Sequence, residues 1–206
     1  FSEGIKANDI YKSVNYYGRA YSYFEIKNFE KAKMDIESSL LSEKVHKESI
    51  NSNIYWLKGL VASSEGDKKL EIECYEKAIA FSPENQGLKT TLGLALIEDD
   101  QFQKGIELLD NVLKKNSQDA YALCNRALGF IKIRELEKAK SDLDNSKKLD
   151  NENPLLYKNY FLYYKEKGEK ENACEAIEEA LKKKMSDYGG DEDTKELIQM
   201  KNEYCA

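Results

Sequence analysis

The sequence predicts an all-α fold made of stacked helix–turn–helix units, and three observations lead to this prediction. Only 2 of the 206 residues are proline, while Lys, Glu, Leu and Ala are abundant, a composition that favours helices. Apolar residues in the segment 121–133 fall at three- and four-residue steps, which marks one stripe along a helix. Similar segments also recur along the chain at a fixed interval, as they do in repeat proteins.

The interval is 34 residues. Gly59, Gly93 and Ala127 stand in matching contexts, and a further interval of the same length reaches Phe161. The matching residue before Gly59 is Ala20, so the first interval, from 20 to 59, contains five extra residues. Small side chains at these places predict close contact between the two helices of a unit, because a large side chain would hold the axes apart.

The second half of each unit recurs as well, in the segments 28–40, 68–83, 101–113, 135–149 and 169–181. These segments share a small residue at an equivalent place in four units, namely Ala32, Gly105, Ala139 and Ala173. The second unit departs from this pattern with Lys68 and Glu71, which predicts irregular packing of its second helix. Phe161 departs in the fifth unit, where it is expected to face a different neighbour, as a terminal repeat would.

The period and its motif residues resemble the tetratricopeptide-repeat family over about residues 13–185; the motif residues include Gly59, Gly93, Ala127, Ala78, Ala180 and Pro83. The resemblance implies a right-handed superhelical solenoid of about five units, at 13–46, 52–85, 86–119, 120–153 and 154–187. One unit alone buries too little surface, so stacked units must share a continuous core. Residues 1–12 are expected to form an N-terminal extension, and an apolar stripe within 191–206 predicts a C-terminal capping helix.

Composition and motifs argue against several classes of function. The net charge is −6, whereas a nucleic-acid-binding protein is expected to carry a basic surface. The sequence contains no run of 18 apolar residues, so no membrane-spanning helix is predicted. No phosphate-binding or metalloprotease motif occurs, and His46, the sole histidine, is expected to be an exposed linker residue. We therefore expect no catalysis and no cofactor.

The four cysteines, Cys74, Cys124, Cys174 and Cys205, form no CxxC pair, which argues against a zinc site. Their scatter over separate helices predicts small buried side chains without a native disulfide, and unpaired thiols favour a cytoplasmic location. The chain begins at Phe1 and shows no charged-then-apolar leader, and whether a leader was removed stays open.

The family resemblance implies a peptide-binding groove lined by the first helix of each unit. Carried onto this sequence, the groove residues are Val14, Tyr17, Tyr21 and Phe24, then Trp56, Leu60 and Ser63, then Thr90, Leu94 and Ile97, then Cys124, Asn125, Leu128 and Ile131, and finally Lys158, Asn159, Leu162 and Lys165. This lining is aromatic at its N-terminal end and more polar at the other. The alternative is that Trp56 and Tyr21 pack against their own neighbours or an N-terminal segment.

The resulting prediction is a non-catalytic scaffold that binds a peptide or protein segment in this groove. One alternative is an adaptor that reads the C-terminal tail of a chaperone through a carboxylate clamp. Asn125 and Lys158 match two clamp positions, whereas Thr90, Leu94 and Leu162 do not. A second alternative is a regulatory or targeting module of a larger assembly. The sequence identifies neither the partner nor the oligomeric state.

Overall fold

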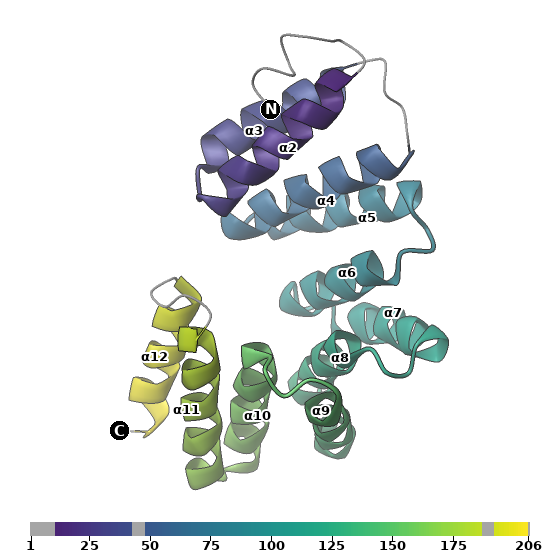
Figure 1. Cartoon of the computed structure of the whole chain (residues 1–206). Coiled ribbons are helices and arrows are strands. Elements are labelled where there is room, and N and C mark those ends of the chain that lie inside the picture. Colours follow the sequence, from purple (N-terminus) through teal and green to yellow (C-terminus); the bar gives the residue numbers. More distant parts are fainter. Residues whose placement is uncertain (1–10, 43–47, 187–191, 206) are drawn as a thin grey trace. The chain divides into compact units, whose positions relative to one another are not determined.

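The computed structural model of the protein describes residues 11–42, 48–186 and 192–205, and these contain helices and no strand, which confirms the predicted all-α class (Figure 1). The helices are α2 (Lys12–Glu25), α3 (Phe29–Leu41), α4 (Glu48–Ser64), α5 (Lys68–Phe81), α6 (Gln86–Glu98), α7 (Phe102–Lys115), α8 (Ala120–Lys132), α9 (Leu136–Leu149), α10 (Pro154–Lys167), α11 (Lys170–Ser186) and α12 (Glu192–Cys205). His46 and most of the predicted extension at 1–12 lie outside the described residues.

The chain divides into two compact parts, an N-terminal part (Phe1–Ala95) and a C-terminal part (Leu96–Ala206). In the N-terminal part α2 packs on α3 and α4 packs on α5, while α4 also contacts α2 and α3. In the C-terminal part α8 packs on α7 and α9, α10 contacts α8, α9 and α11, and α12 packs on α11. Each part is thus a stack of helix pairs, and the right-handed path of the whole chain stays a prediction.

The turn inside each helix pair has the same backbone conformation at the same repeat position. Lys27, Gly66, Asp100, Arg134 and Gly168 all have positive φ, between 57° and 77°. The amide of the residue after each of them donates to a carbonyl five residues earlier, as Asp67 N does to Ala62 O at 2.9 Å. This is a Schellman ending, which satisfies a carbonyl at the end of the first helix. The 34-residue period is therefore visible in the backbone itself.

Small residues lie at the contacts between paired helices, as the repeat predicted. Ala20 and Ala127 are fully buried, and a Cβ added to Gly59 would overlap Cε1 of Tyr75 and lie 2.7 Å from its Cδ1. Phe161 is also buried, and its ring meets that of Tyr204 of α12 edge to face, with centroids 5.7 Å apart. The terminal helix is thus the different neighbour that accommodates this large side chain.

A charged residue stands in the buried second helix of the second repeat. Glu71 is 4% exposed, and its carboxylate accepts from Lys68 Nζ at 2.9 Å, one turn earlier on α5. A buried carboxylate needs such a partner, because leaving it alone would cost several kcal/mol, on the order of 3–5. The two residues that depart from the repeat pattern therefore compensate for each other.

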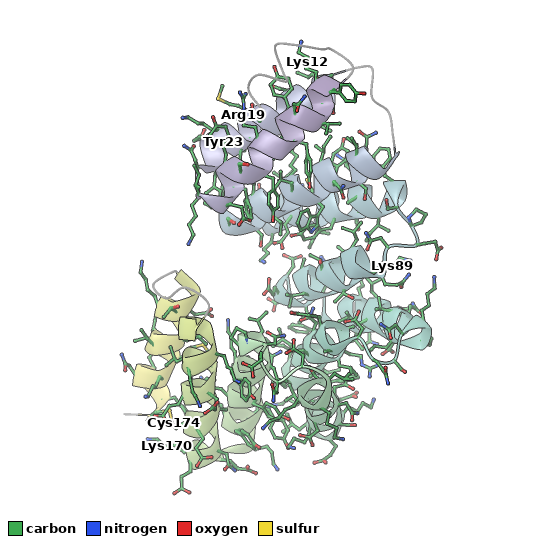
Figure 2. All side chains as sticks on the ribbon, in the orientation of Figure 1. Lys12, Arg19, Tyr23, Lys89, Lys170 and Cys174 are labelled. Atoms are coloured by element: carbon green, nitrogen blue, oxygen red, sulfur yellow. A yellow bond between two sulfur atoms is a disulfide. The ribbon has the colours of Figure 1, made fainter. Side chains whose placement is uncertain are left out.

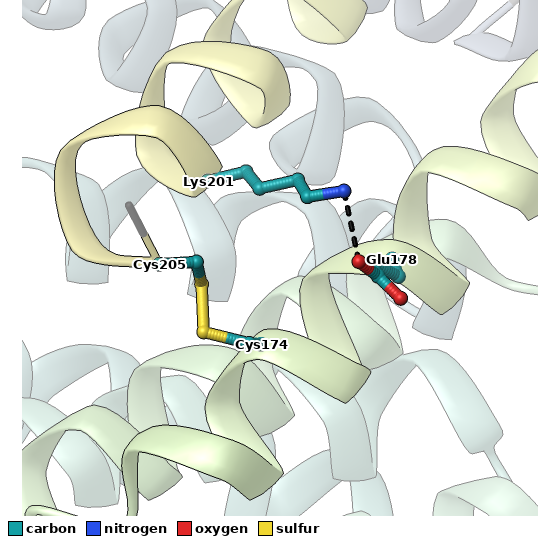
Figure 3. The surroundings of a disulfide bond; sticks show 4 residues. All are labelled: Cys174, Glu178, Lys201 and Cys205. Atoms are coloured by element: carbon teal, nitrogen blue, oxygen red, sulfur yellow. Dashed lines mark ion pairs between the residues drawn. A yellow bond between two sulfur atoms is a disulfide. The ribbon is translucent and has the colours of Figure 1, made fainter.

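The prediction that the cysteines form no disulfide was wrong. Cys174 of α11 is bonded to Cys205 of α12, with the two Cα atoms 5.7 Å apart (Figure 3). Beside the bond, Lys201 Nζ of α12 lies 2.9 Å from a carboxylate oxygen of Glu178 (Figure 3). The scatter of the cysteines along the sequence was misleading, because α12 folds back along α11 and brings distant positions together. Cys74 and Cys124 are free and buried.

The contact at Gly59 can be tested by adding one methyl group. We expect Gly59→Ala to destabilise the protein by roughly 1–3 kcal/mol, because the methyl group overpacks against Tyr75. Urea unfolding followed by circular dichroism measures the change. Gly87→Ala is the control, since the added Cβ meets only Oδ1 of the exposed Asn85 side chain, at 3.3 Å. Replacing a helical glycine by alanine stabilises a helix by up to about 1 kcal/mol. Equal stability of Gly59→Ala and the wild type would contradict the packing described.

The disulfide can be tested by counting thiols. In denaturant without reductant, maleimide labelling and mass spectrometry should find two reactive cysteines, and after reduction it should find four. In the folded protein Cys124 should resist labelling, because burial raises the pKa of its thiol to about 12. Four labelled cysteines before reduction would show that Cys174 and Cys205 are not joined.

Candidate binding surfaces

The N-terminal part carries five of the predicted groove residues side by side, and we call Tyr17, Tyr21, Phe24, Trp56 and Leu60 the aromatic patch. Tyr17, Tyr21 and Phe24 follow one another at helical spacing on α2, while Trp56 and Leu60 are one turn apart on α4. The rings of Tyr21 and Trp56 stack with centroids 6.4 Å apart and an interplanar angle of 20°. This stacking joins the first helices of two neighbouring repeats.

The patch is half-buried. Tyr17, Phe24, Trp56 and Leu60 pack with one side against the core of the N-terminal part, which contains Ala20. Tyr21 is 39% exposed, and it is the most accessible ring of the patch. Trp56 and Tyr21 therefore pack against each other, in keeping with the predicted alternative of contacts between neighbours, and they still present an aromatic surface to solvent.

The two phenols of the patch stay uncharged at neutral pH. Burial raises the pKa of Tyr17, and the negative charge of Glu25 raises the pKa of Tyr21. A phenol with a pKa above its ordinary value of about 10 keeps its proton and its capacity to donate a hydrogen bond. The surface thus combines neutral aromatic faces with hydroxyl groups at its edge.

The other predicted groove residues of this part differ in accessibility. Val14 is exposed, and Ser63 and Leu94 are partly buried. Thr90 is buried. In the N-terminal part, the predicted groove residues that solvent can reach therefore lie mainly on α2 and α4.

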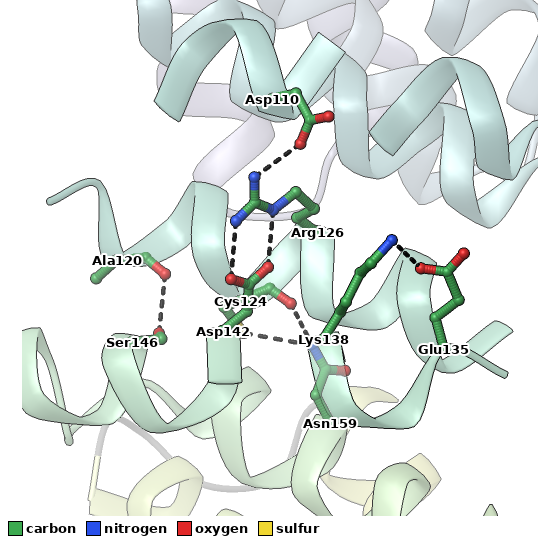
Figure 4. A network of polar contacts seen from close by, with 9 residues as sticks. All are labelled: Asp110, Ala120, Cys124, Arg126, Glu135, Lys138, Asp142, Ser146 and Asn159. Atoms are coloured by element: carbon green, nitrogen blue, oxygen red, sulfur yellow. Dashed lines mark hydrogen bonds and ion pairs between the residues drawn. The ribbon is translucent and has the colours of Figure 1, made fainter. Parts of the chain in front are cut away.

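The predicted polar end of the groove is largely internal. Cys124, Asn125 and Asn159 are buried in the C-terminal part. Asn159 donates from Nδ2 to the carbonyl oxygen of Cys124 at 3.0 Å and to its Sγ at 3.3 Å (Figure 4). Leu128 packs against a core cluster that includes Ile97, and Ile131 lies in the neighbouring cluster. The amide of Asn159 thus holds α10 against α8.

The lysines at this end face the terminal helix. Lys158 Nζ of α10 lies 2.7 Å from a carboxylate oxygen of Glu196 of α12. Lys165 Nζ lies 5.5 Å from the ring centroid of Tyr204, also on α12, and Leu162 packs against the core of the C-terminal part. Lys158, which matches a clamp position, and Lys165 therefore contribute to docking α12.

A set of polar contacts between successive repeats was missed in the sequence. In each case an acidic residue on the second helix of one repeat accepts a hydrogen bond from the first helix of the next repeat. Lys58 donates to Glu37 at 2.5 Å, Arg126 donates to Asp110 at 2.7 Å, and Tyr160 donates to Asp144 at 2.7 Å. These residues occupy equivalent repeat positions, so aligning the repeats would have shown an acidic residue opposite a donor.

Arginine also joins the two helices within a repeat. Arg126 donates from Nε and Nη2 to both carboxylate oxygens of Asp142, at 2.7 and 2.8 Å (Figure 4). Arg19 of α2 (Figure 2) makes the equivalent pair of bonds to Asp35, both at 2.6 Å. Hydrogen bonding to Asp35 raises the pKa of Arg19, and bonding to Asp142 does the same for Arg126. Both guanidinium groups therefore remain charged.

Within the parts of the chain that the structure describes, no group of three or more His, Cys, Asp or Glu side chains is arranged to hold a metal ion. None of the described helices is long and apolar enough to cross a membrane.

Comparison with known proteins supports the repeat. The model of the tetratricopeptide repeat family matches residues 52–85. The chain is 35% identical over 91 residues to the BBSome complex member BBS4 of Bos taurus and 37% identical over 81 residues to that of Mus musculus. These matches cover 44% and 39% of the chain, but only 16% and 14% of the two relatives. The chain thus spans about a sixth of the length of these relatives.

Solved structures share the fold. The chain is similar to YrrB, described as a TPR protein with an unusual peptide-binding site, with a TM-score of 0.62, 20% identity, and 88% of this chain and 91% of that one covered. It is also similar to the type IV pilus biogenesis factor PilW, with a TM-score of 0.71, 15% identity, and 93% and 90% covered. The family model thus matches one repeat of the chain, and the 34-residue period, the recurring turns and the solved structures show that the chain has the fold of tetratricopeptide-repeat proteins.

Proposed function

We propose that this protein is a non-catalytic scaffold that binds a peptide or protein segment at the aromatic patch of its N-terminal part. The observation that carries the proposal is the stacked pair of Tyr21 and Trp56, which presents neutral aromatic surface on the first helices of two repeats. Tyrosine and tryptophan are enriched among the residues that dominate binding energy at protein interfaces. A tetratricopeptide-repeat fold implies a protein-interaction scaffold, and the exposed aromatic surface supports the patch as the proposed binding site.

The comparisons favour a protein partner. The curated relatives are members of a multiprotein complex by their printed names, and one structural neighbour is described as having a peptide-binding site. None of these matches names an enzyme. We therefore propose a role in assembly rather than in catalysis, and a regulatory or targeting role within a larger complex is compatible with it.

The chaperone-tail alternative receives less support. A carboxylate clamp needs Asn125 and Lys158 to reach a ligand, but Asn125 is buried and Lys158 is bound to Glu196. A tail carboxylate would have to displace Glu196 from Lys158. The expected cytoplasmic location also loses its argument, because it relied on unpaired thiols. The disulfide between Cys174 and Cys205 favours an oxidising compartment.

The patch can be tested with peptides selected from a display library against the wild-type protein. We expect Tyr21→Ala together with Trp56→Ala to weaken a selected peptide by about 2 kcal/mol or more, roughly 30-fold in Kd, as measured by calorimetry. Wild-type affinity for an unstructured segment should be on the order of micromolar, because ordering the segment costs free energy. Binding should depend only mildly on salt, since the patch is uncharged.

Two further variants make the peptide test decisive. Tyr21→Ser alone removes the accessible ring and leaves the buried face of Trp56 in place. Loss of binding in this variant can therefore be distinguished from loss of folding. Tyr121→Ala removes a tyrosine of α8 that is 55% exposed outside the patch, and it should bind as the wild type does. Unchanged affinity in the double variant would place the binding surface elsewhere. Strong salt dependence with loss of binding in Lys158→Ala would favour the clamp.

A further inference from the structure

An arginine fills the junction between the third and fourth repeats. Arg126 of α8 donates from Nη1 to Asp110 of α7 at 2.7 Å, and its other nitrogens bind Asp142 of α9 (Figure 4). One guanidinium thus joins three helices of the C-terminal part. It lies in the lining of a surface hollow of about 420 Å³ at this junction. The protein itself therefore shows that this kind of junction accepts a guanidinium between carboxylates.

The next junction, between the fourth and fifth repeats, lacks this arginine. Tyr160 stands 34 residues after Arg126, and its hydroxyl donates to Asp144 at 2.7 Å. Ala176 stands where the preceding repeat has Asp142, so the second carboxylate is absent as well. A hollow of about 260 Å³ opens here between α9, α10 and α11.

The residues around this hollow differ from those of the preceding repeat in a consistent way. On α10, Tyr157 and Tyr160 replace the non-aromatic Leu123 and Arg126, while Tyr164 replaces Phe130. On α11, Glu175 and Glu179 replace the neutral Ser141 and Asn145. Tyr157, Tyr160 and Tyr164 share one face of α10. The two glutamates are one turn apart on α11. Aromatic rings and carboxylates have thus been added together, and both attract cations.

The rings of the hollow already hold cations of the chain. Lys147 Nζ lies 5.6 Å from the centroid of Tyr157 and 5.7 Å from that of Tyr160, and Lys140 Nζ lies 5.7 Å from that of Tyr160. Burial opposes ionisation of Asp144, but hydrogen bonds from Lys140 and Tyr160 hold its pKa below its ordinary value. Lys140 and Asp144 therefore neutralise each other, at Nζ–oxygen distances of 2.6 and 2.7 Å.

Among the side chains that line the hollow, carboxylates outnumber ammonium groups once the Lys140–Asp144 pair is set aside. With Lys140 and Asp144 paired, the wall formed by Glu175 and Glu179 carries two carboxylates against the single ammonium of Lys147, which is exposed. Glu179 lies 3.4 Å from Lys182 Nζ, and its charge also acts on Lys183. An incoming cation would thus meet carboxylates on α11 and aromatic faces on α10.

We propose that this hollow, lined by Tyr157, Tyr160, Tyr164, Glu175 and Glu179, binds an arginine side chain of a partner protein. Arginine fits better than lysine, because a planar guanidinium can stack on a tyrosine ring and donate two hydrogen bonds to carboxylates at the same time. The site lies in the C-terminal part and shares no residue with the aromatic patch, so the two surfaces can be tested independently.

The test uses the full chain and titrates it with N-acetyl-arginine amide, followed by NMR. Saturable shifts should map to α10 and α11, with Kd on the order of millimolar for so small a ligand. N-acetyl-lysine amide should bind at least about 5-fold more weakly, because it lacks the planar fork. Equal affinity for the two probes, or shifts that do not saturate, would overturn the assignment of arginine.

A double variant blocks the site from within. Tyr160→Arg with Ala176→Asp restores the arrangement of Asp110, Arg126 and Asp142 from the preceding repeat, leaves the net charge unchanged and should abolish binding of the arginine probe. Retained binding in this variant would overturn the proposal. A thermal melt checks its folding.

Surface variants keep the test valid if that double variant fails to fold. Glu175→Gln with Glu179→Gln changes only the outer wall and should weaken the arginine probe at least about 10-fold. Glu107→Gln, an exposed carboxylate of α7 outside this lining, is the control and should bind as the wild type does. Equal affinity of the double glutamine variant and this control would contradict the proposal. Binding of selected peptides at the aromatic patch should be unchanged in all of these variants.

Discussion

The close approach of the two helices in each repeat is the constraint on which the rest of the structure depends. The turn between them needs one residue with positive φ, and the same position supplies it in Lys27, Gly66, Asp100, Arg134 and Gly168. The helix axes can then approach only where side chains are small, as Gly59 is against Tyr75. Because each pair is closed in this way, its outer faces are left to bind the next repeat, and every surface described above is built on those faces.

The sequence predicts the parts of the fold that repeat and misses those that occur once. The period locates Gly59 and Ala127 at helix contacts, because the same packing requirement returns every 34 residues. The pairing of Cys174 with Cys205 occurs a single time and depends on how α12 folds back, which no period records. The polar groove residues illustrate a third case: Asn159 has the right spacing for a groove, but spacing alone does not show that its amide binds Cys124.

Differences between equivalent repeat positions carry functional information that the shared pattern hides. The junction between repeats keeps an acidic residue on one side, in Glu37, Asp110 and Asp144, while the donor opposite varies. A guanidinium is replaced by a phenol at the last junction, and the protein gains an aromatic hollow at the cost of an internal ion pair. Ion pairs of this partly buried kind contribute little net stability, so exchanging one for the proposed arginine site is energetically tolerable.

The bond between Cys174 and Cys205 also determines how the C-terminal end carries mechanical load. A force applied at Cys205 passes through the sulfur bridge directly into α11, because the covalent link is shorter than the path along the chain between the two cysteines, which are 31 positions apart in the sequence. The segment between them is then shielded from tension, and α12 cannot be peeled from the last repeat while the bridge is intact. A protease cut within that segment would likewise leave both pieces attached.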